Sequence, residues 1–250
     1  MQKHFLPVVV TLYLLLSSAV SLAADDEELA RSILEKSDQI RFPRDSFQVD
    51  VAINTSSPEQ PLDTHKYRVL SKGNENSIVM TTEPASERGQ ILLMKGRDLW
   101  IFMPSVSQPV RLSLSQRLVG QVANGDLARA NFSGDYNPSI VRTDTIDGEK
   151  HWVLELIGVD RGVTYHKVLY WVRQSNFWPY RAEFYSLSDR LLKTARYENF
   201  QMMLGKERPI RLVMEDALRK GEQSVLEYSS MKLRDLPDKV FTKDYLKKLE

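Results

Sequence analysis

Residues 138–159 read PSIVRTDTIDGEKHWVLELIGV and contain the clearest structural signal of the chain. Asp147-Gly148 is a connection of the kind that closes a β-hairpin, because a two-residue hairpin turn needs positive φ angles that these residue types tolerate. The residues after the turn alternate with a period of two, as expected of a strand, and one face would carry Trp152, Leu154 and Leu156. The stretch therefore predicts two antiparallel strands joined by a tight turn.

The same pattern extends over most of the chain. Turn residues separate similar apolar segments, for example at Lys72-Gly73-Asn74 and Lys220-Gly221. Regular spacing with short turns predicts consecutive antiparallel strands in one domain, rather than strand–helix–strand units. The candidate strands are 46–55, 64–72, 76–83, 88–95, 98–103, 138–146, 150–159, 165–173, 179–187, 190–200, 208–216 and 222–234.

Several of these strands are apolar on both faces. Within 98–103, for example, Trp100 and Phe102 alternate with Leu99 and Ile101. An antiparallel sheet with one face in water alternates apolar with polar residues instead. The pattern indicates either that something covers the second face or that the sheet curls around an apolar interior.

Composition excludes several classes of function. The chain has 250 residues, of which 42% are hydrophobic and 27% charged, which is typical of a globular protein. Its formal net charge of +1 gives no basic footprint for a nucleic acid partner. The absence of cysteine excludes disulfides, thiolate catalysis and Cys-ligated metals.

The first residues indicate export. A basic start at Lys3 precedes the almost wholly apolar stretch from Phe5 to Leu16, and Ser21-Leu22-Ala23 resembles a small-x-small cleavage site. We expect residues 1–23 to be a signal peptide cleaved near Ala23, which leaves a mature domain of residues 24–250. An uncleaved membrane anchor is the alternative, because the apolar stretch could just span a bilayer.

Helices are expected in three places. Leu29, Ala30, Ile33 and Leu34 define one apolar helical face near the mature N-terminus, and Phe241 to Leu249 resembles a short final helix that docks on the sheet. Residues 104–137 interrupt the strand pattern. Asn124 or Asp126 could cap a short helix within this stretch. A connection of this length in a compact β domain is often a lid or binding loop.

No catalytic or metal-binding constellation is evident. The histidines that would survive cleavage, His65, His151 and His166, do not have the spacing of metal ligands. No nucleophile motif or phosphate-binding loop is present. We therefore predict neither a catalytic site, a metal site nor a cofactor. A lipid or glycan hydrolase is the least favoured of three hypotheses, because the sequence supplies no nucleophile or acid–base pair. It stays among the three because a pair of carboxylates can be close in space without being close in sequence.

The tryptophans and methionines are concentrated on strand positions. Each taken singly is consistent with an ordinary core. As a set, on strands that are apolar on both faces, they favour an apolar ligand cavity, since methionine adapts to irregular apolar surfaces.

The middle of the chain resembles the outer-membrane lipoprotein-sorting family related to LolA. The most specific matches are Asp98-Leu99-Trp100-Ile101-Phe102-Met103-Pro104 and Asn124-Gly125-Asp126-Leu127-Ala128-Arg129. Weaker ones are Glu87-Arg88-Gly89-Gln90, Gln116-Arg117-Leu118, Asp135-Tyr136, Tyr170-Trp171, Leu192-Lys193 and Phe241-Thr242. The resemblance implies a mainly β fold with flanking helices: an incomplete antiparallel β-barrel (half-barrel) of about 11 strands, covered by short helices and enclosing an apolar cavity.

The resemblance also implies a function. Its members are similar to periplasmic carriers that shield the acyl chains of lipoproteins or lipids on the way to the outer membrane of Gram-negative cells, with transient membrane contact. The expected lining residues are Met80, Leu92, Met94, Trp100, Phe102, Trp152, Leu154, Leu169, Trp171, Phe184 and Met214. The expected lid is the segment 116–132, with Leu118, Val119, Leu127 and Phe132.

A structural adaptor is the runner-up hypothesis. Relatives in this branch accompany large inner-membrane transporters of the resistance-nodulation-division (RND) type, so such a transporter is a candidate partner. In this alternative the same half-barrel is a periplasmic subunit of the transporter, and protein rather than lipid covers its apolar surface.

Overall fold

One large antiparallel sheet dominates the molecule. The computed structural model describes residues 26–58, 60–73, 75–129 and 131–246. Over these residues thirteen strands form a single sheet in the order β6-β5-β4-β3-β2-β1-β15-β14-β13-β12-β11-β10-β9, and β7 and β8 form a separate pair. The expected signal peptide, residues 1–23, lies outside the described residues. Among the helices of the described part, none is long and apolar enough to cross a membrane.

The sheet consists of two meanders. The first contains β1 (Phe47–Ser57), β2 (Gln60–Lys72), β3 (Asn76–Glu83), β4 (Ile91–Lys95), β5 (Asp98–Met103) and β6 (Val106–Leu112). The second contains β9 (Tyr136–Ile146), β10 (Glu149–Gly158), β11 (Lys167–Arg173), β12 (Pro179–Tyr185), β13 (Leu191–Met203), β14 (Lys206–Asp216) and β15 (Gln223–Leu233). The predicted mainly β, antiparallel architecture is confirmed.

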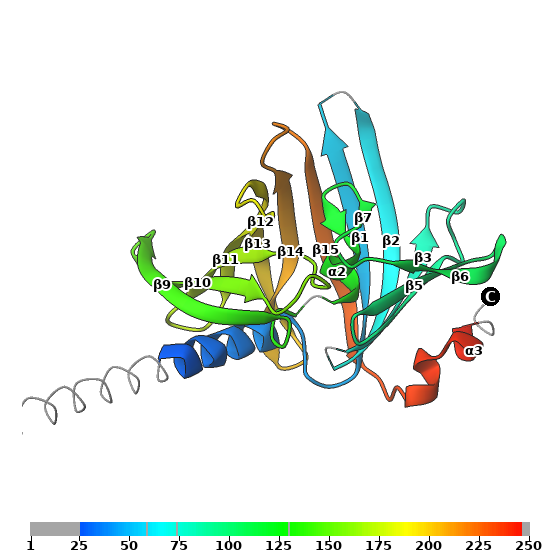
Figure 1. Cartoon of the computed structure of the whole chain (residues 1–250), viewed down its shortest axis with the longest axis horizontal. Helices are drawn as coiled ribbons and strands as arrows, with labels where there is room; N and C mark the ends of the chain where they lie inside the picture. The colour runs from blue at the N-terminus through cyan, green and yellow to red at the C-terminus, as the bar shows by residue number, and fades with distance from the viewer. Residues whose placement is uncertain (1–25, 59, 74, 130, 247–250) are drawn as a thin grey trace, which may run out of the picture.

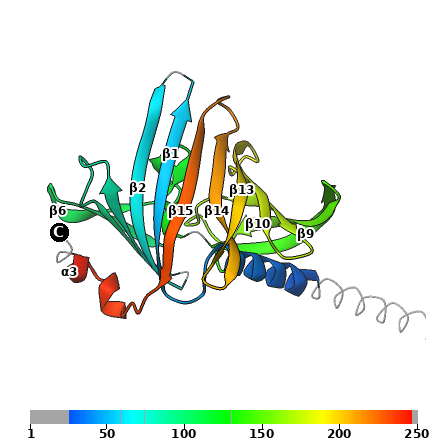
Figure 2. The same cartoon turned by 180° about the vertical axis from the view of Figure 1, so that it is seen from behind.

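Pairing between the first and last strands joins the two meanders. β1 and β15 run antiparallel from Phe47 opposite Leu233 to Ser56 opposite Gln223. This pairing leaves β6 and β9 at the two ends of the strand order, so the sheet stays open and does not close into a barrel. Figures 1 and 2 show the long central strands standing between two curved flanks.

The strand count differs from the expected number of about 11. Part of the difference is β6, which falls inside the predicted interruption of residues 104–137. Its side chains are mostly exposed and it contains Pro109. Proline cannot donate to a strand ladder and is tolerated at an edge. Because most of its side chains are exposed, β6 lacks the alternation of apolar and polar residues by which the other strands are recognised.

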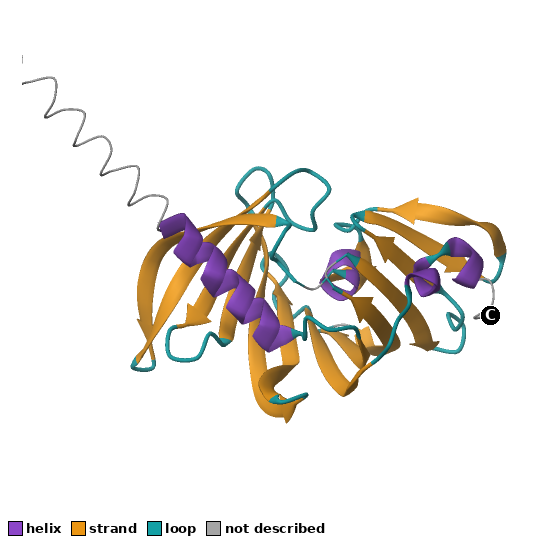
Figure 3. Cartoon of the chain, turned by 90° about the horizontal axis from the view of Figure 1, so that it is seen from below, coloured by secondary structure: helices purple, strands orange, loops and turns teal. Residues whose placement is uncertain are grey.

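The two faces of the sheet have different covers. We call the face of the sheet that carries the large buried cluster the inner face. The helix of residues 26–41 contributes Ala30, Ile33 and Leu34 to this cluster. These three confirm the predicted apolar helix face, whereas Leu29 is 46% exposed. The connection from β6 to β9, residues 113–135, also contributes to this cluster. This crossing segment contains β7 (Arg117–Val119), β8 (Val122–Ala123) and α2 (Asn124–Ala128). Figure 3 shows α2 within the opening of the curved sheet.

The C-terminal segment packs on the opposite, outer face. The short helix η1 (Asp238–Phe241) and α3 (Lys243–Leu246) bury Val240, Phe241 and Leu246 in a second, smaller cluster. The expected final helix therefore docks on the sheet over the residues described. The fully buried strand residues beneath it, Ile78, Ile91 and Leu93, belong to β3 and β4, and partly buried residues of β2 and β5 surround them.

Truncation of Phe241 tests this packing. Phe241 is 2% exposed, and replacing a buried phenylalanine by alanine costs about 3–5 kcal/mol. We expect Phe241→Ala to lower the free energy of unfolding by about that amount in urea denaturation. The control Leu233→Ala, at a side chain that is 53% exposed, should stay within about 0.5 kcal/mol of wild type. Equal stability of the two variants would mean that the C-terminal segment does not contribute to the fold.

Candidate functional site

The inner face carries six of the eleven residues predicted to line a cavity. Five are buried in the inner cluster, and the sixth, a tryptophan, is partly buried against it and stacks on Phe177 with ring centroids 5.5 Å apart. The six are Leu92, Met94, Trp152, Leu154, Phe184 and Met214. The two flanks of the sheet thus contribute to one continuous apolar surface.

The other five lie outside that cluster. Met80, Trp100 and Phe102 pack against the C-terminal segment in the outer cluster, where Lys243 Nζ lies 4.6 Å from the Trp100 ring centroid. Leu169 and Trp171 alternate with three β11 residues that belong to the inner cluster. The structure therefore does not bring the eleven residues together on one face.

Polar partners hold Trp171 on the outer face. Its Nε1 donates a hydrogen bond to Asp144 Oδ2 at 2.8 Å, and the guanidinium carbons of Arg142 and Arg181 lie 5.5 and 3.9 Å from its ring centroid. These partners come from β9 and β12, so the alternation within β11 could not show which of its two apolar faces points inward.

The crossing segment covers the middle of the inner face. Leu127 and Phe132 are buried in the inner cluster, and Leu118 and Val119 pack partly buried against it. All four predicted lid residues therefore contact the apolar surface. Little space remains beneath them: one cavity of about 30 Å³ is lined by residues including Phe42, and another of about 20 Å³ by residues including Met214.

The expected apolar cavity is thus filled in this structure. A cavity needs about 10–15 Å³ to hold one water molecule, so these spaces are of water size and do not accommodate an acyl chain. The helix of residues 26–41 and the crossing segment, which together we call the cover, fill the space against the inner face.

The buried carboxylate of Asp38, in the helix of residues 26–41, joins the two parts of the cover. Asp38 accepts hydrogen bonds from Phe132 N at 3.0 Å and from Ser133 N and Oγ, each at 2.7 Å. Arg41 Nη1 lies 3.3 Å from Asp38 Oδ1, and its guanidinium carbon lies 4.6 Å from the Phe132 ring centroid. Burial raises the pKa of Asp38, and Arg41 and the hydrogen bonds oppose that rise.

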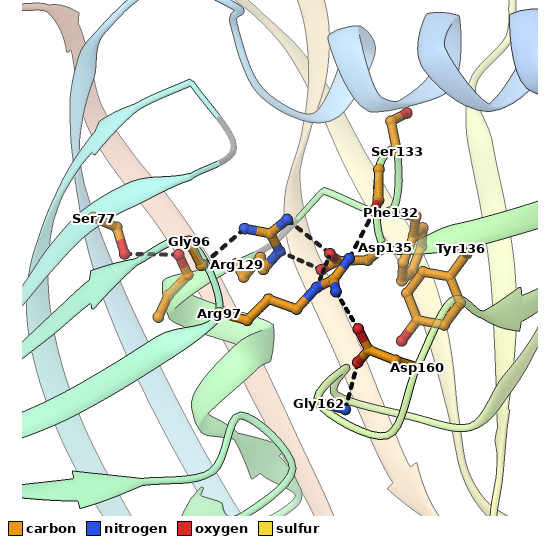
Figure 4. Close-up of polar contacts among 12 residues, drawn as sticks. Ser77, Gly96, Arg97, Arg129, Phe132, Ser133, Asp135, Tyr136, Asp160 and Gly162 are labelled. Atoms are coloured by element: carbon orange, nitrogen blue, oxygen red, sulfur yellow. Dashed lines mark hydrogen bonds and ion pairs between the residues drawn. The ribbon is translucent and has the colours of Figure 1, made fainter.

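A second polar cluster fastens the end of the crossing segment (Figure 4). Arg129 donates to Asp135 Oδ1 at 2.7 Å and to the Gly96 carbonyl at 3.0 Å. Arg97 donates to the same Asp135 oxygen at 3.0 Å and also pairs with Asp160. We call Arg97, Arg129, Asp135 and Asp160 the clasp. Because Arg97 lies between β4 and β5 while Asp135 and Asp160 flank β9 and β10, the clasp bridges the two flanks of the open sheet.

The Asn124-Gly125-Asp126 motif shapes the start of α2. Asn124 does not cap the helix as expected but donates its side-chain N–H to the Ser113 carbonyl at 3.0 Å. Asp126 accepts from Ala123 N at 2.8 Å and from Tyr165 Oη at 2.5 Å, so it is the residue that satisfies a free amide at the helix start. A Cβ at Gly125 would lie 3.0 Å from Thr164 Cβ, and this close approach explains the glycine.

Among the described residues, no three or more His, Asp or Glu side chains are grouped so that they could hold a metal ion. Both clasp carboxylates pair with arginines, and of the two Asp135 is buried whereas Asp160 is 52% exposed. What the site offers chemically is an apolar surface and a cover attached to it by polar contacts.

The fold is thus an open antiparallel sheet that curves around an apolar inner face, with helices and a crossing segment covering that face. The chain belongs to the LolA superfamily. It is 72% identical to a LolA superfamily protein from Nitrosomonas europaea, with a TM-score of 0.84 over 86% of this chain and 98% of that structure. A family model described as an uncharacterized protein matches residues 73–248.

Two more distant structures share the fold. A putative outer membrane lipoprotein-sorting protein domain from Vibrio parahaemolyticus is 20% identical, with a TM-score of 0.76 over 88% of this chain and 99% of that one. A DUF1329 family protein from Desulfovibrio piger is also 20% identical, with a TM-score of 0.75 over the same shares. None of the curated proteins matches the chain.

Removal of the clasp carboxylate tests how the cover is held. Asp135→Ala leaves two guanidinium groups without their shared acceptor, so the crossing segment should detach more often from the sheet. We expect amide hydrogen exchange over residues 117–129 to accelerate about tenfold or more, because a free-energy change of 1.4 kcal/mol is worth a factor of ten. Exchange in β1, β2 and β15 should stay at the wild-type rate.

The matched control is Asp144→Ala, which removes a carboxylate that accepts from Arg142 Nε at 2.9 Å and from Trp171 Nε1 on the outer face. It should leave exchange in the crossing segment unchanged. An Asp135→Ala protein with wild-type exchange in that segment would show that the clasp does not hold the cover.

Proposed function

We propose that this protein is a periplasmic carrier that binds acyl chains of lipoproteins or lipids between its inner sheet face and its cover. It moves them toward the outer membrane and catalyses no reaction. The single domain of residues 24–250 provides the sheet and the cover, and the segment 116–132 acts as the lid. The six inner-face residues Leu92, Met94, Trp152, Leu154, Phe184 and Met214 contact the cargo.

The observation that carries this proposal is how the cover is attached. Among the described residues, β7 and β8 pair only with each other, and the backbone hydrogen bonds of residues 113–129 stay within that stretch. The contacts from this stretch to the sheet involve side chains, such as the 2.7 Å bond from Ser77 Oγ to the Ala128 carbonyl. The cover can therefore move away without breaking a strand ladder.

The energies involved are compatible with exchange between cover and cargo. Burying one methylene contributes about 0.8 kcal/mol, so a chain of a dozen carbons gains on the order of 10 kcal/mol when it leaves water. Leaving a buried charge without its partner costs about 3–5 kcal/mol. This part of the cost of opening the clasp is one that an acyl chain can offset.

Analysis of bound cargo tests the proposal directly. The chain is exported to the periplasm, purified without detergent, and subjected to native mass spectrometry and lipid extraction. We expect stoichiometric lipid or acylated protein. A folded protein that carries nothing and takes up no fluorescent hexadecanoic acid would overturn the carrier proposal, and the RND-transporter adaptor would then be the better explanation.

A disulfide lock tests whether the cover must move. The chain has no native cysteine, so Gly125→Cys with Thr164→Cys creates a single pair between α2 and the loop before β11. Disulfides need Cβ atoms about 3.5–4.5 Å apart, close to the 3.0 Å available here. We expect the oxidised lock to take up fluorescent hexadecanoic acid at least tenfold more weakly than its reduced form.

The single variant Thr164→Cys is the control and should bind equally well before and after oxidation. If the locked protein binds as well as the reduced one, cargo does not enter by displacement of α2.

A further inference from the structure

A large cleft opens at the rim of the sheet, outside the clasp. It has a volume of about 570 Å³ and lies between residues 115–123 of the crossing segment, the loop of residues 160–166, and the turns that join β12 to β13 and β14 to β15. These two turns lie next to each other at the same rim of the sheet in Figure 1. We call it the rim cleft.

Positive charge dominates the rim cleft. Four cationic side chains, one histidine and two carboxylates line it. The cations are Arg117, Arg161, Lys193 and Arg219, and the histidine is His166. The whole chain has a formal charge of only +1, so this excess is a local feature and not a reflection of overall composition.

The two carboxylates are already engaged. Asp160 pairs with Arg97 of the clasp and accepts from Gly162 N at 2.7 Å. Asp216 accepts from Leu218 N at 2.7 Å and Arg219 N at 2.9 Å. Asp216 therefore makes its direct contacts within its own turn, and its charge, like that of Asp126, offsets only part of the effect of burial on the pKa of Lys193.

Three of the cations lack a carboxylate partner. Among the described residues, no carboxylate oxygen lies within 4.0 Å of the charged nitrogens of Arg117, Arg161 or Lys193. Lys193 Nζ instead donates to the Gln121 carbonyl. Burial lowers the pKa of Lys193, since a charged ammonium is disfavoured away from water. A negative charge in the cleft would compensate this cost.

The rim cleft adjoins the apolar interior. Val122, Val163 and Tyr165 line the cleft and also belong to the inner cluster. Tyr165 lines both the cleft and the internal cavity of about 20 Å³, whose other residues include Phe184 and Met214. Tyr165 and its neighbour Thr164, which lines both spaces as well, thus separate a cationic opening from the proposed acyl site.

Exposed leucines flank this opening. Leu187 is 69% and Leu218 59% exposed, and both line the rim cleft on adjacent turns. Cations beside exposed apolar side chains suit a molecule that is anionic at one end and apolar at the other.

We infer that the rim cleft binds the anionic headgroup, a phosphate or a carboxylate, of an acyl amphiphile whose chain passes Tyr165 into the interior. The inference rests on the proposed carrier function and specifies its substrate class. Arg117, Arg161 and Lys193 bind the headgroup, and the inner face beneath the cover binds the chain.

Two amphiphiles that differ only in the headgroup test the inference. Isothermal titration compares 1-palmitoyl-lysophosphatidic acid with 1-monopalmitoylglycerol, which has the same chain and glycerol but no phosphate. We expect the wild-type protein to bind the phosphate form at least tenfold more tightly. The double variant Arg117→Gln/Arg161→Gln should lose this preference and keep its affinity for monopalmitoylglycerol, and Lys193→Met should reduce the preference.

The control variant Arg88→Gln/Lys150→Gln removes two charges outside the rim cleft and should retain the preference. Equal wild-type affinity for both amphiphiles would overturn the headgroup inference and leave the carrier proposal standing. A wild-type protein that binds neither would overturn both. Inorganic phosphate that binds as tightly as the lysolipid, with the same dependence on Arg117, would contradict the role of the chain and identify the source of the anion as free phosphate.

Discussion

The pairing of β1 with β15 determines how the rest of the chain is arranged. Since β1 also pairs with β2, and β15 with β14, the two meanders extend away from the central pair in opposite directions. The last strands of the two meanders, β6 and β9, lie at opposite ends of the thirteen-stranded order. Along the chain, only the crossing segment separates them. The residues between them must cross the open side of the sheet. A segment over the inner face is thus a consequence of strand order and not an addition to the fold.

Contacts of charged side chains hold the crossing segment, because its backbone has no strand partner in the large sheet. It meets the sheet across the inner face, where strand backbone groups already pair with neighbouring strands. Side chains must therefore make its attachments: Arg129 donates to the Gly96 carbonyl, and the buried carboxylate of Asp135 accepts from Arg97. Replacing a buried ion pair by well-packed apolar residues is often neutral or stabilising, so such contacts are weak evidence for a large net stabilisation. Such an attachment keeps a segment in one place while its separation from the sheet costs only a few interactions.

Local pattern was sufficient to predict the strands but not which way each strand faces. A period of two shows that Trp100 and Leu99 point to opposite faces, and the structure places Trp100 outside and Leu99 inside. Both faces are apolar because each has its own cover, so hydrophobicity carries no information about direction. The C-terminal segment that covers Trp100 lies more than a hundred residues further along the chain. The polar sites were harder still to anticipate, since Asp135 of the clasp meets Arg97 from 38 residues upstream and separate turns and loops build the rim cleft.

A covered inner face suits the opposing demands of the proposed carrier function. An uncovered apolar groove would expose surface to water at a cost of about 25 cal/mol per Å² and would invite aggregation. Leu127 and Phe132 are buried on the inner face, so the chain covers that surface with its own residues. In the proposed mechanism, the net free energy of binding an acyl chain is the gain from burying the chain minus the loss from exposing the surface that the cover had buried. Such a difference would let the protein take an acyl chain out of water and still release it to a membrane.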